Sequence, residues 1–243
     1  MNQATNPVEP ATNSGTAAIP ARGTSRTSAV QLLVALVVEL VGVPLVQSLP
    51  AADLVEAALL TVVMVFAVLA VGGRHRDLAI ALGLLVPTLV CKWLNHFRPD
   101  LIPAWPFLLG AMCLFGFVVA RLLAFIVRAK HVDANVLCAG LSGFLMLGLL
   151  WMPPYLAVAR ADPQAFIIPT APGAPVTFDG FSAYYFSFIT LCTVGYGDIV
   201  PVAPLARALA VMEGITGLFY MAVMISRLVA MYTTALPPDT SEK

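Results

Sequence analysis

Six long apolar segments run through this sequence, and they constrain its fold more than any other feature. A helix needs about 20 apolar residues to cross the hydrocarbon core of a bilayer. Charged residues make up only 11% of the chain and the mean hydropathy is +0.90, so there is too little charge to cover a water-facing surface of this size. We expect membrane-spanning helices at residues 30–48, 52–72, 77–95, 104–128, 133–154 and 204–232.

The stretch between the fifth and sixth apolar segments has a different character. Residues 155–180 read as a loop, because prolines recur through their second half. The apolar, aromatic run from Phe181 to Leu191 is too short to cross a membrane and is typical of a re-entrant helix. Asp179 fits the N-cap position of that helix. The sequence therefore predicts an all-α membrane protein with six transmembrane helices and a short helix between the fifth and sixth.

The distribution of Lys and Arg predicts the orientation of the spans, because cytoplasmic loops are enriched in these residues. With six spans, one set of basic residues falls on a single side of the membrane: Arg22, Arg26, Arg74, Arg76, Arg128, Lys130, Arg227 and Lys243. The basic residues in segments facing outward are Arg98, Arg160 and Arg207. We therefore expect a multi-pass protein of the plasma membrane, or of a bacterial inner membrane, with both termini in the cytoplasm.

A glycine-containing pentapeptide follows the short helix directly: Thr193, Val194, Gly195, Tyr196 and Gly197. A dehydrated ion needs oxygens in place of its water shell, and backbone carbonyls supply them if successive ones face one axis. An extended strand alternates its carbonyls, so such an arrangement requires left-handed backbone angles, which glycine adopts without a Cβ penalty. The competing interpretation is a glycine-rich surface turn, but a turn needs no membrane-embedded helix before it.

This pentapeptide resembles the TVGYG core of the potassium-channel selectivity filter, and its setting resembles bacterial potassium channels with six spans and one pore loop. The resemblance implies that K⁺ binds at the main-chain oxygens of Thr193, Val194, Gly195 and Tyr196, and that Gly197 completes the filter. It also implies an acidic ring at the outer mouth, formed by Asp198 of each subunit.

The same resemblance implies supporting roles for residues around the filter. Those expected to brace it are Tyr185, Phe186, Thr190 and Cys192, with the ring of Tyr196 packing against the first two. Cys192 stands where many members have a second Thr, and Ile189 where some have a Glu that holds the outer-mouth Asp. That bracing of Asp198 is therefore not expected here.

The final span resembles the inner helix that lines the pore of bacterial potassium channels. Its Gly217 falls where many members have a hinge glycine, and with Gly214 it weakens the middle of the helix. Close helix packing is the alternative, because small residues let backbones approach. For Glu213 we expect hydrogen bonds to hydroxyl groups behind the filter, such as Thr190, rather than a direct effect on cavity charge.

The charges inside the first four spans raise the question of voltage sensing. A sensor needs a row of basic residues, since each charge moved through the field supplies about 2.3 kcal/mol per 100 mV. From Ala104 to Val127 the fourth span holds one basic residue, Arg121, while Arg128 lies at its inner end, which predicts weak voltage dependence or none. Glu39 lies at a depth similar to Arg121 and would pair with it if the first and fourth spans touch. Glu56 and Lys92 would pair near the outer surface.

We divide the chain into a disordered cytoplasmic N-terminus (1–27), a four-helix transmembrane bundle (28–130), a pore domain (131–232) and a short cytoplasmic tail (233–243) that leaves no room for a regulatory domain. The pore domain would hold an outer helix, a pore helix, the filter and an inner helix. One pore loop supplies part of a filter, so we expect a homotetramer in the lipid bilayer.

The predicted function is passive transport of K⁺, without enzymatic chemistry or an organic cofactor. The zero net charge argues against a nucleic-acid partner. The four cysteines lie in apolar runs and form no CxxC pair, so they indicate neither a disulfide framework nor a metal site. Two other functions stay open: a non-selective cation channel, and a non-conducting membrane subunit or scaffold that keeps a relic filter.

Overall fold

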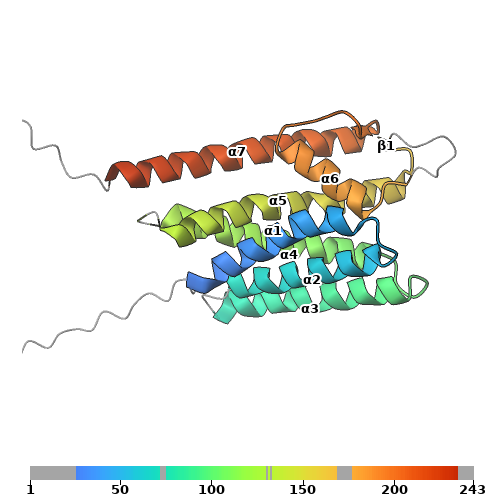
Figure 1. The fold of residues 1–243 in the computed structure, drawn as a ribbon, viewed down its shortest axis with the longest axis horizontal. Helices are drawn as coiled ribbons and strands as arrows, with labels where there is room; N and C mark the ends of the chain where they lie inside the picture. The colour runs from blue at the N-terminus through green and yellow to red at the C-terminus, as the bar shows by residue number, and fades with distance from the viewer. Residues whose placement is uncertain (1–25, 72–74, 130, 132, 169–176, 235–243) are drawn as a thin grey trace, which may run out of the picture.

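The computed structural model describes residues 26–71, 75–129, 131, 133–168 and 177–234 (Figure 1). Most of the N-terminal segment predicted to be disordered, and the tail from residue 235, lie outside these residues. The elements, in chain order, are α1 (Arg26–Val46), α2 (Ala52–Val71), α3 (His75–Phe97), α4 (Trp105–Arg128), α5 (Ala134–Ala161), β1 (Phe166–Ile167), α6 (Gly180–Leu191), β2 (Val200–Pro201) and α7 (Pro204–Thr234).

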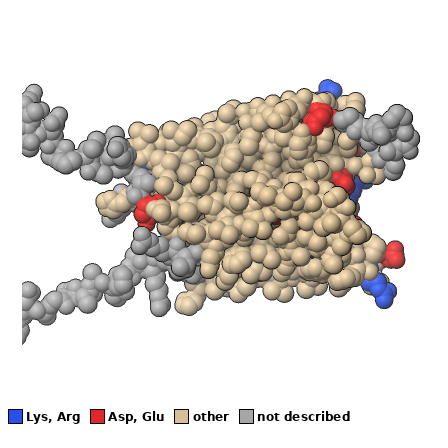
Figure 2. Space-filling view, in the orientation of Figure 1, with Lys and Arg blue, Asp and Glu red and all other residues tan. Residues whose placement is uncertain are grey.

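Six of the described helices are long and apolar enough to cross a membrane: α1 to α5 and α7. They run side by side, and α1 begins at the end of the bundle where α7 ends (Figure 1). Figure 2 shows acidic side chains at both ends and basic ones at the right-hand end, with a wide band between them on the face in view that is almost free of charge. The predicted all-α class with six long apolar helices is confirmed, and the chain is a multi-pass membrane protein.

The fifth span ends later than predicted. Its helix continues through Pro153 and Pro154 to Ala161, although proline lacks the N–H that would bond the carbonyl four residues earlier. Packing compensates for the missing bonds, because Tyr155 is fully buried and lies edge-on to the rings of Phe166 and Phe186. The prediction that residues 155–161 form a loop was therefore wrong. Such prolines are tolerated in membrane helices where neighbouring elements cover the freed groups.

α5 lies between two groups of helices, α1 to α4 on one side and α6 with α7 on the other. α1 contacts α2 and α5, while α4 contacts α3 and α5, and α6 lies between α5 and α7 (Figure 1). Glycines of α5 permit close approach: an added Cβ would lie 2.2 Å from the Tyr220 hydroxyl at Gly143 and 2.7 Å from the Phe188 ring at Gly148. α5 is therefore the element on which both the short helix and the last span rest.

The predicted charge pairs are wrong, because they depended on which helices are neighbours. Arg121 of α4 forms an ion pair with Asp77 of α3, and this is the single ion pair among the described residues. Glu39 is buried on α1, and its Oε2 has no hydrogen-bond partner in the part of the chain that the structure describes. Lys92 donates to the backbone oxygen of Ala57, 2.8 Å away, rather than pairing with Glu56.

A two-stranded antiparallel sheet, not predicted from the sequence, ties the two loops around α6 together. Ile167 of β1 is paired with Val200 of β2, and Phe166 with Pro201. The backbone N–H of Val202 also donates to the oxygen of Ala165 at 2.8 Å. The segment that follows the pentapeptide is thus anchored to the end of α5.

Candidate functional site

The short helix α6 aims its C-terminal end at the pentapeptide. The side chain of Asp179 accepts a hydrogen bond from the backbone N–H of Ser182 at 2.8 Å, which confirms its N-cap position. The helix ends at Leu191, and the N–H of Cys192 closes its last turn on the oxygen of Phe188. Because a helix C-terminus carries partial negative charge, this end of α6 favours a nearby cation.

The backbone of the pentapeptide has positive φ at every second residue. The φ values are 58° at Thr193, 52° at Gly195 and 81° at Gly197. The sequence predicts left-handed angles at the two glycines, but not at Thr193. A β-branched residue with positive φ is uncommon and strained, and such strain concentrates at functional sites. In an ordinary strand successive carbonyls point to opposite sides. Left-handed angles at every second residue change this, so that successive carbonyls can face the same side.

The N–H groups at the start of the pentapeptide all turn back onto α6. The N–H of Thr193 donates to the oxygen of Thr190 at 3.0 Å, and those of Val194 and Gly195 donate to the oxygen of Ile189 at 2.9 and 3.3 Å. In a trans peptide the C=O points opposite to the N–H of the same plane. The carbonyls of Cys192, Thr193 and Val194 therefore face away from α6, toward the surface of this chain.

Asp198, directly after the pentapeptide, is held by a tyrosine. Its Oδ2 accepts from the Tyr185 hydroxyl at 2.7 Å, and its Oδ1 accepts from the backbone N–H of Ile199 at 3.0 Å. The hydrogen bond from Tyr185 holds the pKa of Asp198 below its ordinary value of 3.8. A tyrosine on α6 thus braces Asp198, which was not expected from the sequence.

The predicted bracing residues occupy different surroundings. Tyr185 contacts Asp198, and the backbone oxygen of Thr190 accepts from Thr193, so both support the pentapeptide. Phe186 instead packs in an aromatic cluster with Tyr155 and Phe166, on the side of α6 that faces α5. The cluster joins α6 to α5 and to the loop that follows α5, and the bracing of the pentapeptide by Phe186 stays a prediction. Cys192 is exposed at the helix end.

Glu213 of α7 is fully buried and joins three helices. Its Oε2 accepts from the hydroxyl of Tyr155 on α5 at 2.5 Å, and its Oε1 lies 2.6 Å from the hydroxyl oxygen of Ser187 on α6. Bonding to hydroxyls behind the pentapeptide is as predicted, but the partners are these two residues and not Thr190. The missed signal was Ser187, a polar residue within the short apolar run of α6.

The last helix buries a single narrow stripe in this chain. The buried positions of its described side chains recur every three, four or seven residues and face α5 and α6: Ala206, Glu213, Gly217, Tyr220 and Met224. Only 22% of the most apolar window of α7 is buried, against 61% for α5. The pentapeptide is exposed as well, with Val194 at 49% and Tyr196 at 74%. Among the described residues, most of α7 and the side chains of Val194 and Tyr196 are thus left uncovered by protein.

The two glycines near the middle of α7 have different surroundings. A Cβ at Gly217 would lie 2.7 Å from the backbone oxygen of Leu191, the last residue of α6, whereas a Cβ at Gly214 would meet no other side chain or loop atom of the described residues within 4 Å. The helix itself is continuous from Pro204 to Thr234. For Gly217 the geometry favours close packing over a hinge, and Gly214 keeps the predicted hinge interpretation.

We expect Gly217→Ala to destabilise the protein by about 1–3 kcal/mol, because the new methyl group pushes against backbone that cannot move aside. Gly214→Ala is the matched control, since it adds the same methyl group to the same helix in open space and raises helix propensity. Thermal unfolding of the purified variants, followed by far-UV circular dichroism, compares the two. Equal melting temperatures for both variants would contradict the packing interpretation.

Residues 164–234 match a family model described as an ion channel. The match covers less than a third of the chain; it includes α6, the pentapeptide and α7, but does not reach the first five helices. It confirms that the segment resembles ion channels, which are transport proteins and not enzymes.

Two curated relatives share short regions with the chain. The inward rectifier potassium channel Kirbac3.1 of Paramagnetospirillum magnetotacticum is 39% identical over 51 residues, which are 21% of this chain and 17% of the relative. The two pore potassium channel c of Oryza sativa subsp. japonica is 33% identical over 85 residues, which are 33% of this chain and 18% of the relative. The chain thus spans less than a fifth of the length of either relative. No solved structure matches it.

Proposed function

We propose that this chain is one subunit of a potassium-selective channel and that four copies surround a common pore. The observation that carries the proposal is the backbone after α6: alternate residues have positive φ, and three successive N–H groups bond back onto the helix. The carbonyls in the same peptide planes, those of Cys192, Thr193 and Val194, face away from the helix, where such oxygens would replace the water shell of an ion. The similarity to two potassium channels supports K⁺ as the permeant ion.

A tetramer supplies what one chain lacks. One pentapeptide presents one set of carbonyls, whereas potassium-channel filters use four such loops around an axis. The exposed face of α7 is apolar along its length, and a neighbouring copy and the pore would cover it: Leu205, Val211, Met212, Ile215, Leu218, Phe219, Ile225 and Val229. Chemical cross-linking of the protein in native membranes, followed by electrophoresis, would show a ladder that ends at four.

Each part of the site has a role in permeation under this proposal. The carbonyls of Thr193, Val194, Gly195 and Tyr196 bind K⁺, and Gly197 completes the turn of the backbone. The C-terminal end of α6 stabilises a cation below the filter. Four copies of Asp198 concentrate cations at the outer mouth. The basic residues between helices would face the cytoplasm, and both termini would lie on that side as well.

Reversal potentials under bi-ionic conditions test the proposal directly. Purified full-length protein is placed in planar bilayers with K⁺ on one side and Na⁺ on the other. The reversal potential should then lie far from zero, with the sign expected when K⁺ carries the current. A potential near zero would show a non-selective cation channel. Absence of current, together with absence of K⁺ flux in liposomes, would leave the non-conducting subunit or scaffold.

Voltage should change the open probability little. The described part of α4 carries Arg121 at mid-helix, and that side chain is already paired with Asp77 of α3. One charge per subunit moving through the whole field supplies only about 2.3 kcal/mol per 100 mV, and an ion-paired charge moves less. The steady-state current recorded across a wide voltage range should therefore change almost linearly with voltage. A steep rise in open probability would show that further charges move.

We expect Tyr185→Phe to make permeation more sensitive to acid. The variant loses the donor that stabilises the Asp198 carboxylate, so the pKa of Asp198 rises and its charge is lost at higher pH than in the unchanged protein. Inward K⁺ current measured against external pH should therefore fall earlier on acidification. Asp198→Asn is the control, because it removes the titrating group, and Tyr185→Phe should then shift nothing. Identical pH profiles for Tyr185→Phe and the unchanged protein would contradict the role of this hydrogen bond.

A further inference from the structure

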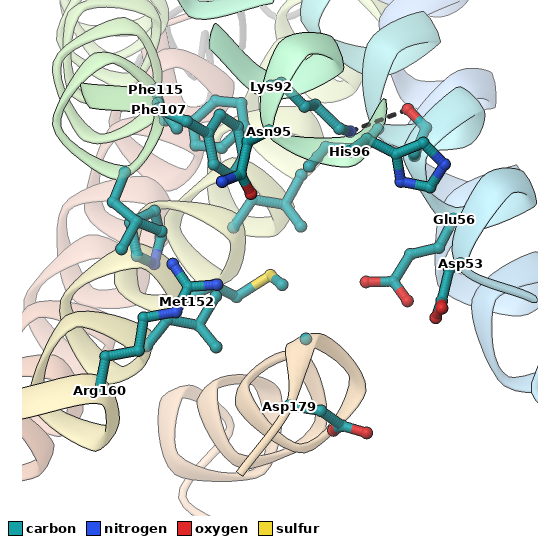
Figure 3. A pocket seen from close by; sticks show the side chains of 18 of the residues that line it. Asp53, Glu56, Lys92, Asn95, His96, Phe107, Phe115, Met152, Arg160 and Asp179 are labelled. Carbon is teal, nitrogen blue, oxygen red and sulfur yellow. Dashed lines mark hydrogen bonds between the residues drawn. The ribbon is translucent and has the colours of Figure 1, made fainter. Parts of the chain in front are cut away.

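A cavity of about 340 Å³ lies apart from the pentapeptide, at the start of α6. Its walls come from α2, α3, α4, α5 and the beginning of α6, so it lies between three of the first four helices and the helices around the pentapeptide. Cavities of this size are typical of small-molecule sites. Figure 3 shows polar side chains from several of these helices pointing into it.

Charges of both signs line this cavity on separate walls. Asp53 and Glu56 project from α2 on one side, while Arg160 reaches in from α5 on the opposite side (Figure 3). Lys92 of α3 lies between them and is only 9% exposed. The structure places no acidic and basic pair of this lining within ion-pair distance, since its one ion pair among the described residues is elsewhere.

Of these charges Lys92 is buried, Glu56 is half-buried, and Asp53 and Arg160 are exposed at the rim. A buried ammonium with unused donors is costly, so this arrangement favours an occupant with acceptor oxygens. The Lys92 ammonium has three donors, and among the described residues it uses one of them, toward the oxygen of Ala57. Asp179 is already engaged as the cap of α6, which leaves Asp53 and Glu56 as acceptors. Glu56 also lies against Gly180, where an added Cβ would meet its Oε1 at 2.7 Å.

The cavity is also lined by apolar residues, most of them buried, against which the start of an acyl chain would pack: Leu60, Leu108, Ala111, Phe115, Leu149 and Met152. An anion alone would face the carboxylates of α2, and a cation alone would face Lys92 and Arg160. A ligand with both charges satisfies both walls.

We propose that this cavity binds a zwitterion that carries a primary ammonium and a phosphate, the chemistry of a phosphatidylethanolamine headgroup. The phosphate accepts from Lys92 and Arg160, and the ammonium donates to Glu56 and Asp53. A phosphocholine headgroup keeps a positive charge but offers no N–H donor, and a phosphoglycerol headgroup offers hydroxyl donors but no cation, so neither gives the carboxylates of α2 a charge-assisted N–H hydrogen bond. The proposal does not depend on ion conduction.

Native mass spectrometry of the purified full-length protein in detergent tests this chemistry. With matched dioleoyl chains, phosphatidylethanolamine should bind about tenfold more tightly than phosphatidylcholine or phosphatidylglycerol, the difference expected for one charge-assisted hydrogen bond. Soluble O-phosphoethanolamine is the second probe. If it displaces the lipid, a free zwitterion is also an occupant; if it does not, the acyl chains are needed and the lipid is the source.

Two variants with matched controls locate the site. Arg160→Gln and Glu56→Gln should each reduce the affinity for phosphatidylethanolamine about tenfold. Arg98→Gln and Asp100→Asn neutralise exposed charges that do not line the cavity, and they should change nothing. Equal affinity for all three lipids, or unchanged affinity in both Arg160→Gln and Glu56→Gln, would overturn the proposal. Displacement by O-phosphoethanolamine is measured on the unchanged protein, so that test survives a variant that fails to fold.

Discussion

Gly195→Ala should reduce K⁺ flux at least about tenfold, although the substitution adds only one methyl group. The φ of Gly195 is 52°, and a residue with a Cβ pays roughly 1–2 kcal/mol to adopt that conformation. No atom of the described residues beyond its chain neighbours lies within 4 Å of the new Cβ, so the effect comes from the backbone and not from a clash within the described part of the subunit. Relaxing the strain rotates the flanking peptide planes, and their carbonyls no longer face the ion.

Liposome flux assays with a K⁺-sensitive dye would measure this loss. Gly83→Ala is the matched control, because its Cβ also enters open space but its φ lies outside the left-handed region. That variant should conduct like the unchanged protein. Gly195→Asp should lose flux completely, since it adds a charged side chain to the same strained position. Normal flux and normal K⁺ over Na⁺ selectivity in Gly195→Ala would contradict the assignment of this backbone to the permeation path.

The features that could be predicted from the sequence depend on local chemistry or on length. Apolar runs of about 20 residues locate membrane helices because the bilayer imposes that length on any span. Asp179 caps α6 through a contact three residues away, and Gly195 adopts its left-handed angle because of its own lack of a side chain. None of these features requires knowledge of which helices are neighbours.

The features that could not be predicted depend on helix neighbours. Glu39 and Arg121 do not pair, because α1 packs on α2 and α5, while α4 packs on α3 and α5. The depth of a residue in the membrane limits which residues it can pair with, but it does not tell which of several helices is its neighbour. The same limit explains Glu213, for which a hydroxyl partner was expected but the residues Tyr155 and Ser187 were not.

The continuation of α5 has a similar cause. A proline pair usually ends a helix when only local propensity is considered. Here the aromatic cluster formed by Tyr155, Phe166 and Phe186 stabilises the turns that follow Pro154. The cluster joins residues far apart in the sequence, so tertiary packing overrides a local signal.

Glu213→Leu should destabilise the protein by about 1–3 kcal/mol, because the buried Tyr155 hydroxyl loses its acceptor. Tyr155→Phe should cost a similar amount by leaving the carboxyl group without its donor. The double variant should cost less than the sum of the two, since neither partner is then left unsatisfied. Tyr184→Phe is the matched control: Tyr184 is also buried, but its hydroxyl has no hydrogen-bond partner among the described residues, so its loss should change stability little.

Glu213→Gln separates two states of the carboxyl group. The hydroxyl of Ser187 carries one proton but lies 2.7 Å from the oxygen of Gly148 and 2.6 Å from Oε1 of Glu213. If it donates to Gly148, then Glu213 must itself donate to Ser187, which requires a protonated carboxyl group. An amide reproduces that pattern, with its oxygen accepting from Tyr155 and its NH₂ donating to Ser187.

We therefore expect Glu213→Gln to melt close to the unchanged protein and far above Glu213→Leu. Thermal unfolding of the four single variants and the double variant in one detergent gives the whole comparison. A Gln variant as unstable as the Leu variant would show that Glu213 is ionised, with the Ser187 proton directed at it. Additive losses in the double variant would show that Tyr155 and Glu213 stabilise the helices around α6 independently.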